Sequence, residues 1–212
     1  MKALLIANSP EFDSEYVESR AGSFDLVVVL DGALSNIPAS VVPHVVCGDF
    51  DSLDVEVAKR RFPSVEFVQL SNQHANDLEK GLVFALERGA QEVVIACALG
   101  GSPAVSLANT SVMVRYHHMS DISMIHGSTT LRALSDRSGV QSEVRVPVRS
   151  GSDFACIAFE NEAVVTLLNL AWELREQVLS PGSHGVGNTT TSEEVAVRVH
   201  RGVVILSYEA LV

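Results

Sequence analysis

The sequence predicts an α/β fold in which a mainly parallel sheet, with helices on both faces, is followed by an all-β sandwich. Over about the first 125 residues, short apolar runs alternate with longer helical patterns. After Gly127 the pattern changes to valine-rich runs that alternate residue by residue. Of the 212 residues, 47% are hydrophobic and 19% are charged, which favours a large packed core. Continuous apolar strands between helices are typical of a parallel sheet covered on both faces.

In the N-terminal part, short runs rich in Val and Ile predict buried strands. They are Ala3–Ala7, Leu26–Leu30, His44–Cys47, Glu66–Leu70, Val93–Ala98 and Asp121–Ile125. The segments between them predict helices at Asp13–Arg20, Val55–Arg61, Asp77–Arg88 and about Ala104–His118. In Asp77–Arg88 the apolar residues recur close to helical spacing, and Gly89 follows as a C-terminal stop.

In the C-terminal part, Glu143–Val148 and Glu194–His200 alternate in the manner of half-buried strands. Val203–Tyr208 follows directly across His200-Arg201-Gly202, which predicts a hairpin turn. Further strands are expected at Cys156–Phe159 and Val164–Leu170. We therefore expect two domains, residues 1–127 and 140–212, with the boundary near Ser128–Gly139.

Composition excludes several classes of protein. The formal net charge is −11 and no Lys/Arg-rich run interrupts the acidity, which argues against a nucleic-acid partner. No stretch reaches about 18 apolar residues, so no membrane span is expected. Cys47, Cys97 and Cys156 are odd in number and lack CxxC spacing, which predicts buried reduced thiols in a cytoplasmic protein.

Acidic residues follow several of the predicted strands, and ligands of open parallel sheets bind at this carboxyl edge. Asp31 follows Leu26–Leu30, and the pentad Gly48–Ser52 follows the next strand. If the pentad is extended, Asp49 and Asp51 project to one side, about 6–7 Å apart. Two such carboxylates can hold Mg²⁺, while Phe50 points into packing. The alternative is a polar turn in which Asp51 or Ser52 caps the next helix.

Two helix starts carry further candidates. Asp77 and Lys80 lie one turn apart, where they would add a third metal-side carboxylate and a phosphate contact. The alternative is a carboxylate favoured by the helix dipole and a solvated lysine. Gly100-Gly101-Ser102-Pro103 ends a strand and starts a helix, with Ser102 as N-cap. Its N–H groups could receive a phosphate, or the segment is simply a well-capped start.

Together these segments resemble the thiamine pyrophosphokinase family, in the same order over nearly the whole chain. Gly48–Ser52 reproduces the family's most distinctive motif. The other matching segments are Asp31-Gly32-Ala33 with Asn36, Gln73–Lys80 (family pattern Gln-Asp-x-Thr-Asp-x-x-Lys), Leu170–Leu174 (Leu-x-Trp/Tyr-x-Leu) and Gly187-Asn188-Thr189 (Ser-Asn-Glu).

The resemblance implies a Rossmann-like catalytic domain that binds ATP and Mg²⁺, followed by a thiamine-binding β-sandwich. It implies a homodimer whose active site lies at the subunit interface, and transfer of diphosphate from ATP to the hydroxyethyl group of thiamine, releasing AMP. By the same resemblance, Asp49, Asp51 and Asp77 hold Mg²⁺ and form the catalytic set, with Asp31 alongside and Lys80 near the phosphates. Gly100, Gly101 and Ser102 would contact ATP, whereas Gln73, Gly187 and Asn188 would contact thiamine.

The chain departs from the family pattern at one motif above all. The family's Gly-Gly-Arg-x-Asp-His is Gly100-Gly101-Ser102-Pro103-Ala104-Val105 here, so the arginine, aspartate and histidine are absent. Asn76 replaces a threonine, Gly187 a serine and Thr189 a glutamate; Arg115 or Arg132 could supply a compensating cation. Two alternatives therefore stay open: a related Mg²⁺-dependent diphosphokinase or nucleotidyltransferase for another heterocyclic alcohol, such as a pterin, and a non-catalytic dimer that senses thiamine or nucleotide.

Overall fold

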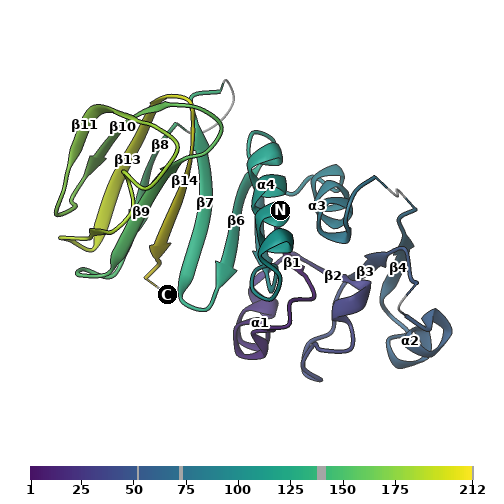
Figure 1. The fold of residues 1–212 in the computed structure, drawn as a ribbon. Helices are drawn as coiled ribbons and strands as arrows, with labels where there is room; N and C mark the ends of the chain where they lie inside the picture. The colour runs from purple at the N-terminus through teal and green to yellow at the C-terminus, as the bar shows by residue number, and fades with distance from the viewer. Residues whose placement is uncertain (52, 72–73, 138–141, 212) are drawn as a thin grey trace. The chain divides into compact units, whose positions relative to one another are not determined.

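The computed structural model describes residues 1–51, 53–71, 74–137 and 142–211, which fall into two compact units (Figure 1). Unit 1 comprises Met1–Val112 and Ser120–Gly127, and unit 2 comprises Met113–Met119 and Ser128–Val212. The assignment of ATP and Mg²⁺ to residues 1–127 and of thiamine to residues 140–212 concerns ligands, and it stays a prediction.

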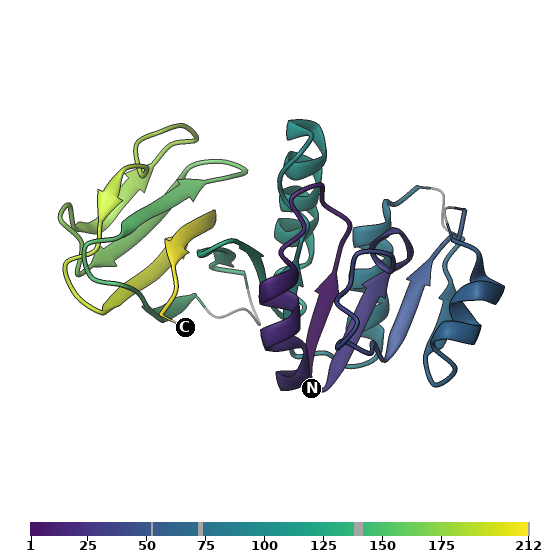
Figure 2. The same ribbon diagram turned by 90° about the horizontal axis from the view of Figure 1, so that it is seen from below.

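Unit 1 contains a parallel sheet, whose strands are seen side by side in Figure 2. Its strands are β1 (Lys2–Ile6), β2 (Leu26–Leu30), β3 (Val45–Gly48), β4 (Glu66–Gln69), β5 (Glu92–Ala96) and β6 (Asp121–His126). The spatial order is β6-β5-β1-β2-β3-β4, and every one of these neighbouring pairs is parallel. The strands expected from the apolar runs are confirmed, with ends that differ by at most two residues.

Helices pack on both faces of this sheet. They are α1 (Ser14–Arg20), α2 (Val55–Arg61), α3 (Asp77–Glu87) and α4 (Pro103–Tyr116). Val17 of α1 and Ala58 of α2 share a buried cluster with Leu4 of β1. In contrast, Gly81 of α3 packs against the side chain of Leu5, the next residue of β1. Because successive residues of a strand point to opposite faces, α3 covers the face opposite to α1 and α2.

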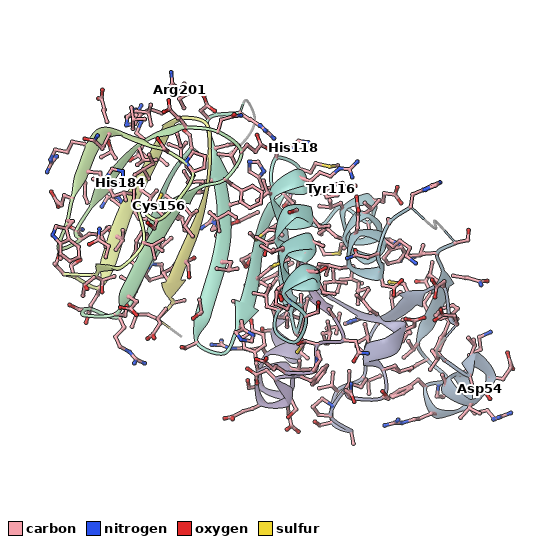
Figure 3. All side chains as sticks on the ribbon, in the orientation of Figure 1. Asp54, Tyr116, His118, Cys156, His184 and Arg201 are labelled. Atoms are coloured by element: carbon pink, nitrogen blue, oxygen red, sulfur yellow. The ribbon has the colours of Figure 1, made fainter. Side chains whose placement is uncertain are left out.

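The start of α2 corrects one expectation. Asp54 caps this helix, since its carboxylate accepts a hydrogen bond of 3.0 Å from the backbone N–H of Val57 (Figure 3 labels Asp54). Asp51 is therefore not the cap, because it lies three residues too early to reach the first free N–H groups. Ser52, the other expected cap, lies outside the described residues.

Unit 2 contains two antiparallel groups of strands. One has the order β12-β9-β14-β7, with β7 (Thr129–Ser135), β9 (Asp153–Ala158), β12 (Asn188–Thr189) and β14 (Val203–Glu209). The other has the order β11-β10-β13-β8, with β8 (Glu143–Pro147), β10 (Ala163–Leu168), β11 (Leu174–Leu179) and β13 (Glu194–Arg201). Residues of both groups, such as Phe154, Leu206, Val165 and Val197, belong to one buried cluster.

The predicted hairpin at His200-Arg201-Gly202 is wrong. β13 pairs with β10 and β8, whereas β14 pairs with β9 and β7, so the two strands belong to different groups. Gly202 turns the chain from one group to the other with a left-handed φ of 90°, and a Cβ there would lie 2.8 Å from the carbonyl oxygen of Glu162. The sequence pattern did not reveal this, because both strands send alternate apolar residues into the same core.

The three cysteines are free and buried, as expected, and Cys156 is labelled in Figure 3. Among the residues that the structure describes, no helix is both long enough and apolar enough to cross a membrane.

Candidate functional site

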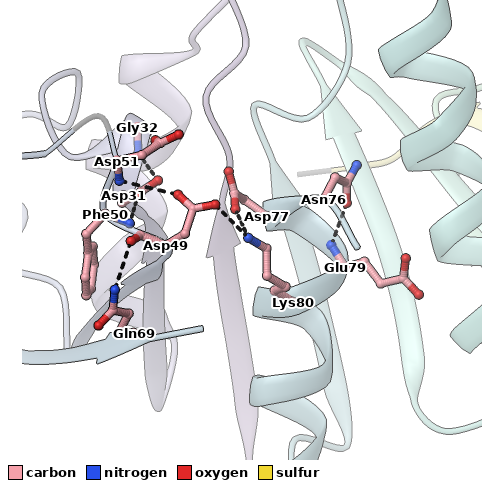
Figure 4. Close-up of polar contacts among 10 residues, drawn as sticks. All are labelled: Asp31, Gly32, Asp49, Phe50, Asp51, Gln69, Asn76, Asp77, Glu79 and Lys80. Atoms are coloured by element: carbon pink, nitrogen blue, oxygen red, sulfur yellow. Dashed lines mark hydrogen bonds and ion pairs between the residues drawn. The ribbon is translucent and has the colours of Figure 1, made fainter. Parts of the chain in front are cut away.

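A cluster of carboxylates lies at the carboxyl ends of β2 and β3, as expected for this edge of a parallel sheet (Figure 4). Asp31 follows β2, and Asp49 and Asp51 follow β3. Each of the three offers one carboxylate oxygen within 4.8 Å of the others. Asp31 is buried at 4% exposure, whereas Asp51 is exposed, so the cluster opens to solvent on one side.

Asp49, Phe50 and Asp51 form a turn and not an extended strand, which corrects the extended conformation considered for this segment. Phe50 has a left-handed φ of 63°, and its ring packs against the unit 1 core and 6.4 Å from the ring of Phe67. The backbone N–H of Asp51 turns back to the carboxylate of Asp49 over 3.4 Å. The inward packing of Phe50 agrees with the sequence expectation, and the turn agrees with the alternative interpretation of this segment.

Asp31 stabilises the turn at Asp49–Asp51 through hydrogen bonds to the backbone. Its carboxylate accepts hydrogen bonds from the backbone N–H of Gly32 over 2.6 Å and from that of Phe50 over 2.8 Å. Gly48 has no side chain at the point of closest approach: a Cβ there would lie 2.5 Å from Cγ of Asp31. The close approach of Asp31 therefore explains why a glycine stands at position 48, whether or not a ligand binds there.

Lys80 brings a buried cation to the same place. It lies near the start of α3, where its ammonium group is 2.7 Å from Oδ1 of Asp77 and 3.2 Å from Oδ2 of Asp49. The Lys80 side chain is 5% exposed, so it is not the solvated lysine of the alternative interpretation. Asn76 caps α3 by accepting a hydrogen bond of 2.9 Å from the N–H of Glu79, which fixes the turn that carries Asp77 and Lys80.

Burial and the neighbouring charges shift the pKa values of Lys80, Asp49 and Asp31. Burial lowers the pKa of Lys80, but the hydrogen bonds to Asp77 and Asp49 outweigh burial and raise that pKa above its ordinary value. The hydrogen bond from Lys80 holds the pKa of Asp49 below its ordinary value. Burial raises the pKa of Asp31 despite the two backbone N–H groups that it accepts, and the nearby Asp77 and Asp49 add to the rise.

The donor set fits a hard divalent cation. Carboxylate oxygens at converging positions are the ligands that Mg²⁺ prefers, together with water and phosphate oxygens. Asp31, Asp49 and Asp51 place three carboxylates around one point, and a single ammonium group cannot neutralise them together with Asp77. In this structure Asp77 contacts Lys80 directly, so it extends the acidic group on the α3 side.

The glycine loop lies at the carboxyl end of β5 in the same unit. Gly100 and Gly101 both have left-handed φ values, 92° and 65°, and α4 begins two residues later at Pro103. The Gly100 N–H donates to Oγ of Ser106 over 3.2 Å. Beside the loop is a cavity of about 210 Å³, to which Asn8, Ser9, Ser102 and Asn109 contribute polar groups.

Asparagines outside the predicted set of site residues connect these parts. Asn36 donates to Asn8 over 2.9 Å, which joins the loops after β2 and β1. Asn76 donates to Asn109 over 2.9 Å, and Asn109 donates to the carbonyl of Ala98 over 2.7 Å. Asn8 could have been suspected from its place directly after a strand, but the partners of Asn109 are distant in sequence.

The remaining predicted residues lie elsewhere. Gln73 lies outside the described residues. Asn188 is buried in unit 2, where its side-chain oxygen accepts from the N–H groups of Trp172 and Thr189 and its amide group donates to the carbonyl of Trp172. Gly187 has a left-handed φ of 81° with open space around it. Arg115 is in the last turn of α4 and Arg132 is in β7; both belong to unit 2.

Comparison with known proteins points to one family. A family model described as "Thiamin pyrophosphokinase, catalytic domain" matches residues 17–125, just over half of the chain. A comparison with curated protein sequences finds no match. Among solved structures, thiamine pyrophosphokinase from Bacillus subtilis is similar with a TM-score of 0.82 and 17% identity over 100% of both chains.

Two further solved structures have the same fold. Thiamin pyrophosphokinase from Geobacillus thermodenitrificans gives a TM-score of 0.81 and 18% identity, over 100% of this chain and 98% of the other. The Candida albicans protein of that name gives 0.77 and 13%, over 99% of this chain and 90% of the other. At these identities the likeness is one of fold: a mixed α/β architecture with a second, antiparallel sheet.

Proposed function

The chain belongs to the thiamin pyrophosphokinase family, and on this premise we propose that it transfers a diphosphate group from ATP to thiamine, giving thiamine diphosphate and AMP. The observation that carries the proposal is the carboxylate cluster of Asp31, Asp49 and Asp51, with the buried ammonium group of Lys80 against it. The protein is thus proposed to be an ATP-dependent diphosphotransferase of thiamine diphosphate biosynthesis.

The reaction is a displacement at phosphorus. The hydroxyl oxygen of thiamine attacks the β-phosphorus of ATP, and the bond from that phosphorus to the oxygen shared with the α-phosphorus breaks. AMP leaves with that oxygen, and the hydroxyl proton passes to a carboxylate or to water. Such transfers depend mainly on positioning and on stabilising charge at the phosphate oxygens, so they suit a site made of charged side chains.

Asp49, Asp51 and Asp77 are proposed to hold Mg²⁺, with Asp31 alongside. Bound Mg²⁺ would neutralise charge on the phosphate oxygens of ATP and make the β-phosphorus more open to attack. Lys80 donates hydrogen bonds to phosphate oxygens, and Asp77 keeps its ammonium group at the cluster, 2.7 Å away. Asp31 positions the Asp49 turn through its bond to the Phe50 N–H.

The other assignments are proposals as well. Gly100, Gly101 and Ser102 line the ATP site of a Rossmann-like domain, residues 1–127, and Gln73, Gly187 and Asn188 contact thiamine from a β-sandwich domain, residues 140–212. The enzyme acts in the cytoplasm as a homodimer with the active site at the subunit interface.

One observation favours a second candidate. The segment Ser102–Val105 carries no charge where the family has Arg, Asp and His. The part of the site that binds the acceptor or the nucleotide therefore offers different side chains from those of the family. A related Mg²⁺-dependent diphosphokinase or nucleotidyltransferase for another heterocyclic alcohol, such as a pterin, would keep the acidic cluster and change this segment. A non-catalytic homologue that only binds thiamine or nucleotide is the remaining alternative.

The test is a product assay with purified protein, ATP, Mg²⁺ and thiamine, in which chromatography follows thiamine diphosphate and AMP. Equal formation of both products, abolished by a chelator, is expected. AMP that forms only with a pterin or another alcohol would transfer the proposal to the second candidate. Tight thiamine or nucleotide binding without AMP would leave the non-catalytic alternative.

A further inference from the structure

Glu11 lies against the glycine loop. It belongs to the segment between β1 and α1, and its Oε1 accepts a hydrogen bond from the backbone N–H of Gly101 over 3.3 Å. Its Oε2 lies 3.4 Å from Nε2 of His126, at the end of β6. The Glu11 carboxylate therefore already occupies the Gly101 N–H, one of the backbone donors of the glycine loop.

The loop is shaped around this segment. A Cβ at Gly100 would lie 2.7 Å from Cδ of Glu11, and one at Gly101 would lie 2.9 Å from Cγ of Pro10. Ser9 ties the segment to the residue before the loop, since its hydroxyl donates to the carbonyl of Leu99 and accepts from the N–H of Glu11. A side chain at either position would have to displace Glu11 or Pro10, and the left-handed φ values of 92° and 65° favour glycine at both.

The charge of Glu11 decides what the neighbouring cavity can accept. The residues that line the cavity of about 210 Å³ are uncharged, and Glu11 adds a negative charge next to Gly100, which is one of them. Phosphate groups bind well to free N–H groups of glycine loops, but here a phosphate would meet a carboxylate in hydrogen-bonding distance of the same loop. Like charges a few ångströms apart repel each other.

We propose that Glu11 is a specificity-determining residue: it acts as an internal anion that keeps phosphate groups off the Gly100–Gly101 loop. This inference rests on the proposed function in that it concerns the ATP site. The phosphates of ATP are then held on the Lys80 side of the site, and the crevice beside the loop receives an uncharged, hydroxyl-bearing part of the substrate. The loss of the family's arginine at Ser102 agrees with this, since a loop that holds no phosphate needs no guanidinium group.

The test measures binding of inorganic pyrophosphate by calorimetry, at low salt and with a chelator present. Glu11→Gln removes the charge and keeps the shape, and should tighten pyrophosphate binding about fivefold. Glu87→Gln removes the same charge from the exposed last turn of α3 and serves as the matched control, with no change expected. Adding Ser102→Asp to Glu11→Gln returns a carboxylate to the loop, and should abolish the gain.

Unchanged or weaker binding by Glu11→Gln would overturn the inference, as would an equal gain in Glu87→Gln or a gain that survives Ser102→Asp. Thermal unfolding of each variant establishes that it is folded before binding is measured. Because pyrophosphate binding needs neither thiamine nor turnover, a gain in Glu11→Gln would uphold the inference even if the product assay found no AMP.

Discussion

The carboxylate of Asp31 accepts a hydrogen bond of 2.8 Å from the backbone N–H of Phe50. This bond ties the end of β2 to the turn after β3, and it thereby sets where Asp49 and Asp51 lie. The turn is otherwise an unfavourable one, because Phe50 adopts a left-handed φ of 63°. A buried side chain thus determines the geometry of two more exposed ones.

The first prediction concerns the space that Asp31 occupies. Gly48→Ala would place a Cβ 2.5 Å from Cγ of Asp31, so either the carboxylate or the strand end must move. We expect the free energy of unfolding to fall by roughly 1–3 kcal/mol and divalent-cation binding to weaken. Urea denaturation and Mn²⁺ titration measure the two effects. Gly22→Ala, where nothing lies within 4 Å, is the control and should change stability by less than about 0.5 kcal/mol.

The second prediction concerns pH, in the absence of metal. Because burial raises the pKa of Asp31 above 3.8, the folded protein binds this proton more tightly than the unfolded chain does. Its contribution to stability is therefore largest at low pH and falls as the pH rises through the interval just above 3.8. Asp31→Asn does not titrate, so its stability relative to wild type should increase over that interval. Urea denaturation at a series of pH values measures this difference.

Asp49→Asn provides the opposite case. The bond from Lys80 lowers the pKa of Asp49 below 3.8, so its contribution is present above that pH and is lost as the pH falls through the lowered value. Asp49→Asn should therefore lose stability relative to wild type as the pH rises through the interval just below 3.8. Curves of the same sign for both variants would contradict the assignment of these shifts.

The third prediction concerns turnover. Asp49→Asn should reduce formation of AMP by about a hundredfold or more and abolish Mn²⁺ binding, while thermal unfolding shows that the variant is still folded at neutral pH. Asp25→Asn, at the amino end of β2 and thus on the opposite edge of the sheet, should leave turnover and metal binding as in wild type. Retained turnover in Asp49→Asn would remove the metal site from the proposed mechanism.

The sequence was sufficient for the parallel sheet because periodicity reports burial, and strands such as Leu26–Leu30 are buried along their whole length. The sequence also predicted that Asp31 and Asp49 lie at one edge of the sheet, because each follows a strand and the carboxyl ends of parallel strands meet at the same edge. The strand β11 escaped notice since most of its residues are exposed, and Leu174–Leu179 contains no apolar alternation.

Other features depend on contacts that local pattern does not encode. The hairpin expected at Gly202 failed because pairing partners are chosen across the core, and two alternating strands look alike whether or not they pair. Glu11 was missed because its partner Gly101 is 90 residues away. The burial of Lys80 likewise depends on how α3 packs, which the spacing of Asp77 and Lys80 leaves open.

The last prediction concerns Asn188, whose side chain makes three hydrogen bonds to the backbone of Trp172 and Thr189. Asn188→Ala would leave these partly buried backbone groups without their side-chain partner, which should lower the free energy of unfolding by about 1 kcal/mol. The exposed Asn161 provides the control, and Asn161→Ala should have almost no effect. Trp172 is 66% exposed and its backbone is held by Asn188. Its indole ring should therefore move more freely in Asn188→Ala, which a lower fluorescence anisotropy would show. A variant with wild-type stability and anisotropy but weaker thiamine binding would mean that Asn188 contacts the substrate directly and does not act through the Trp172 backbone.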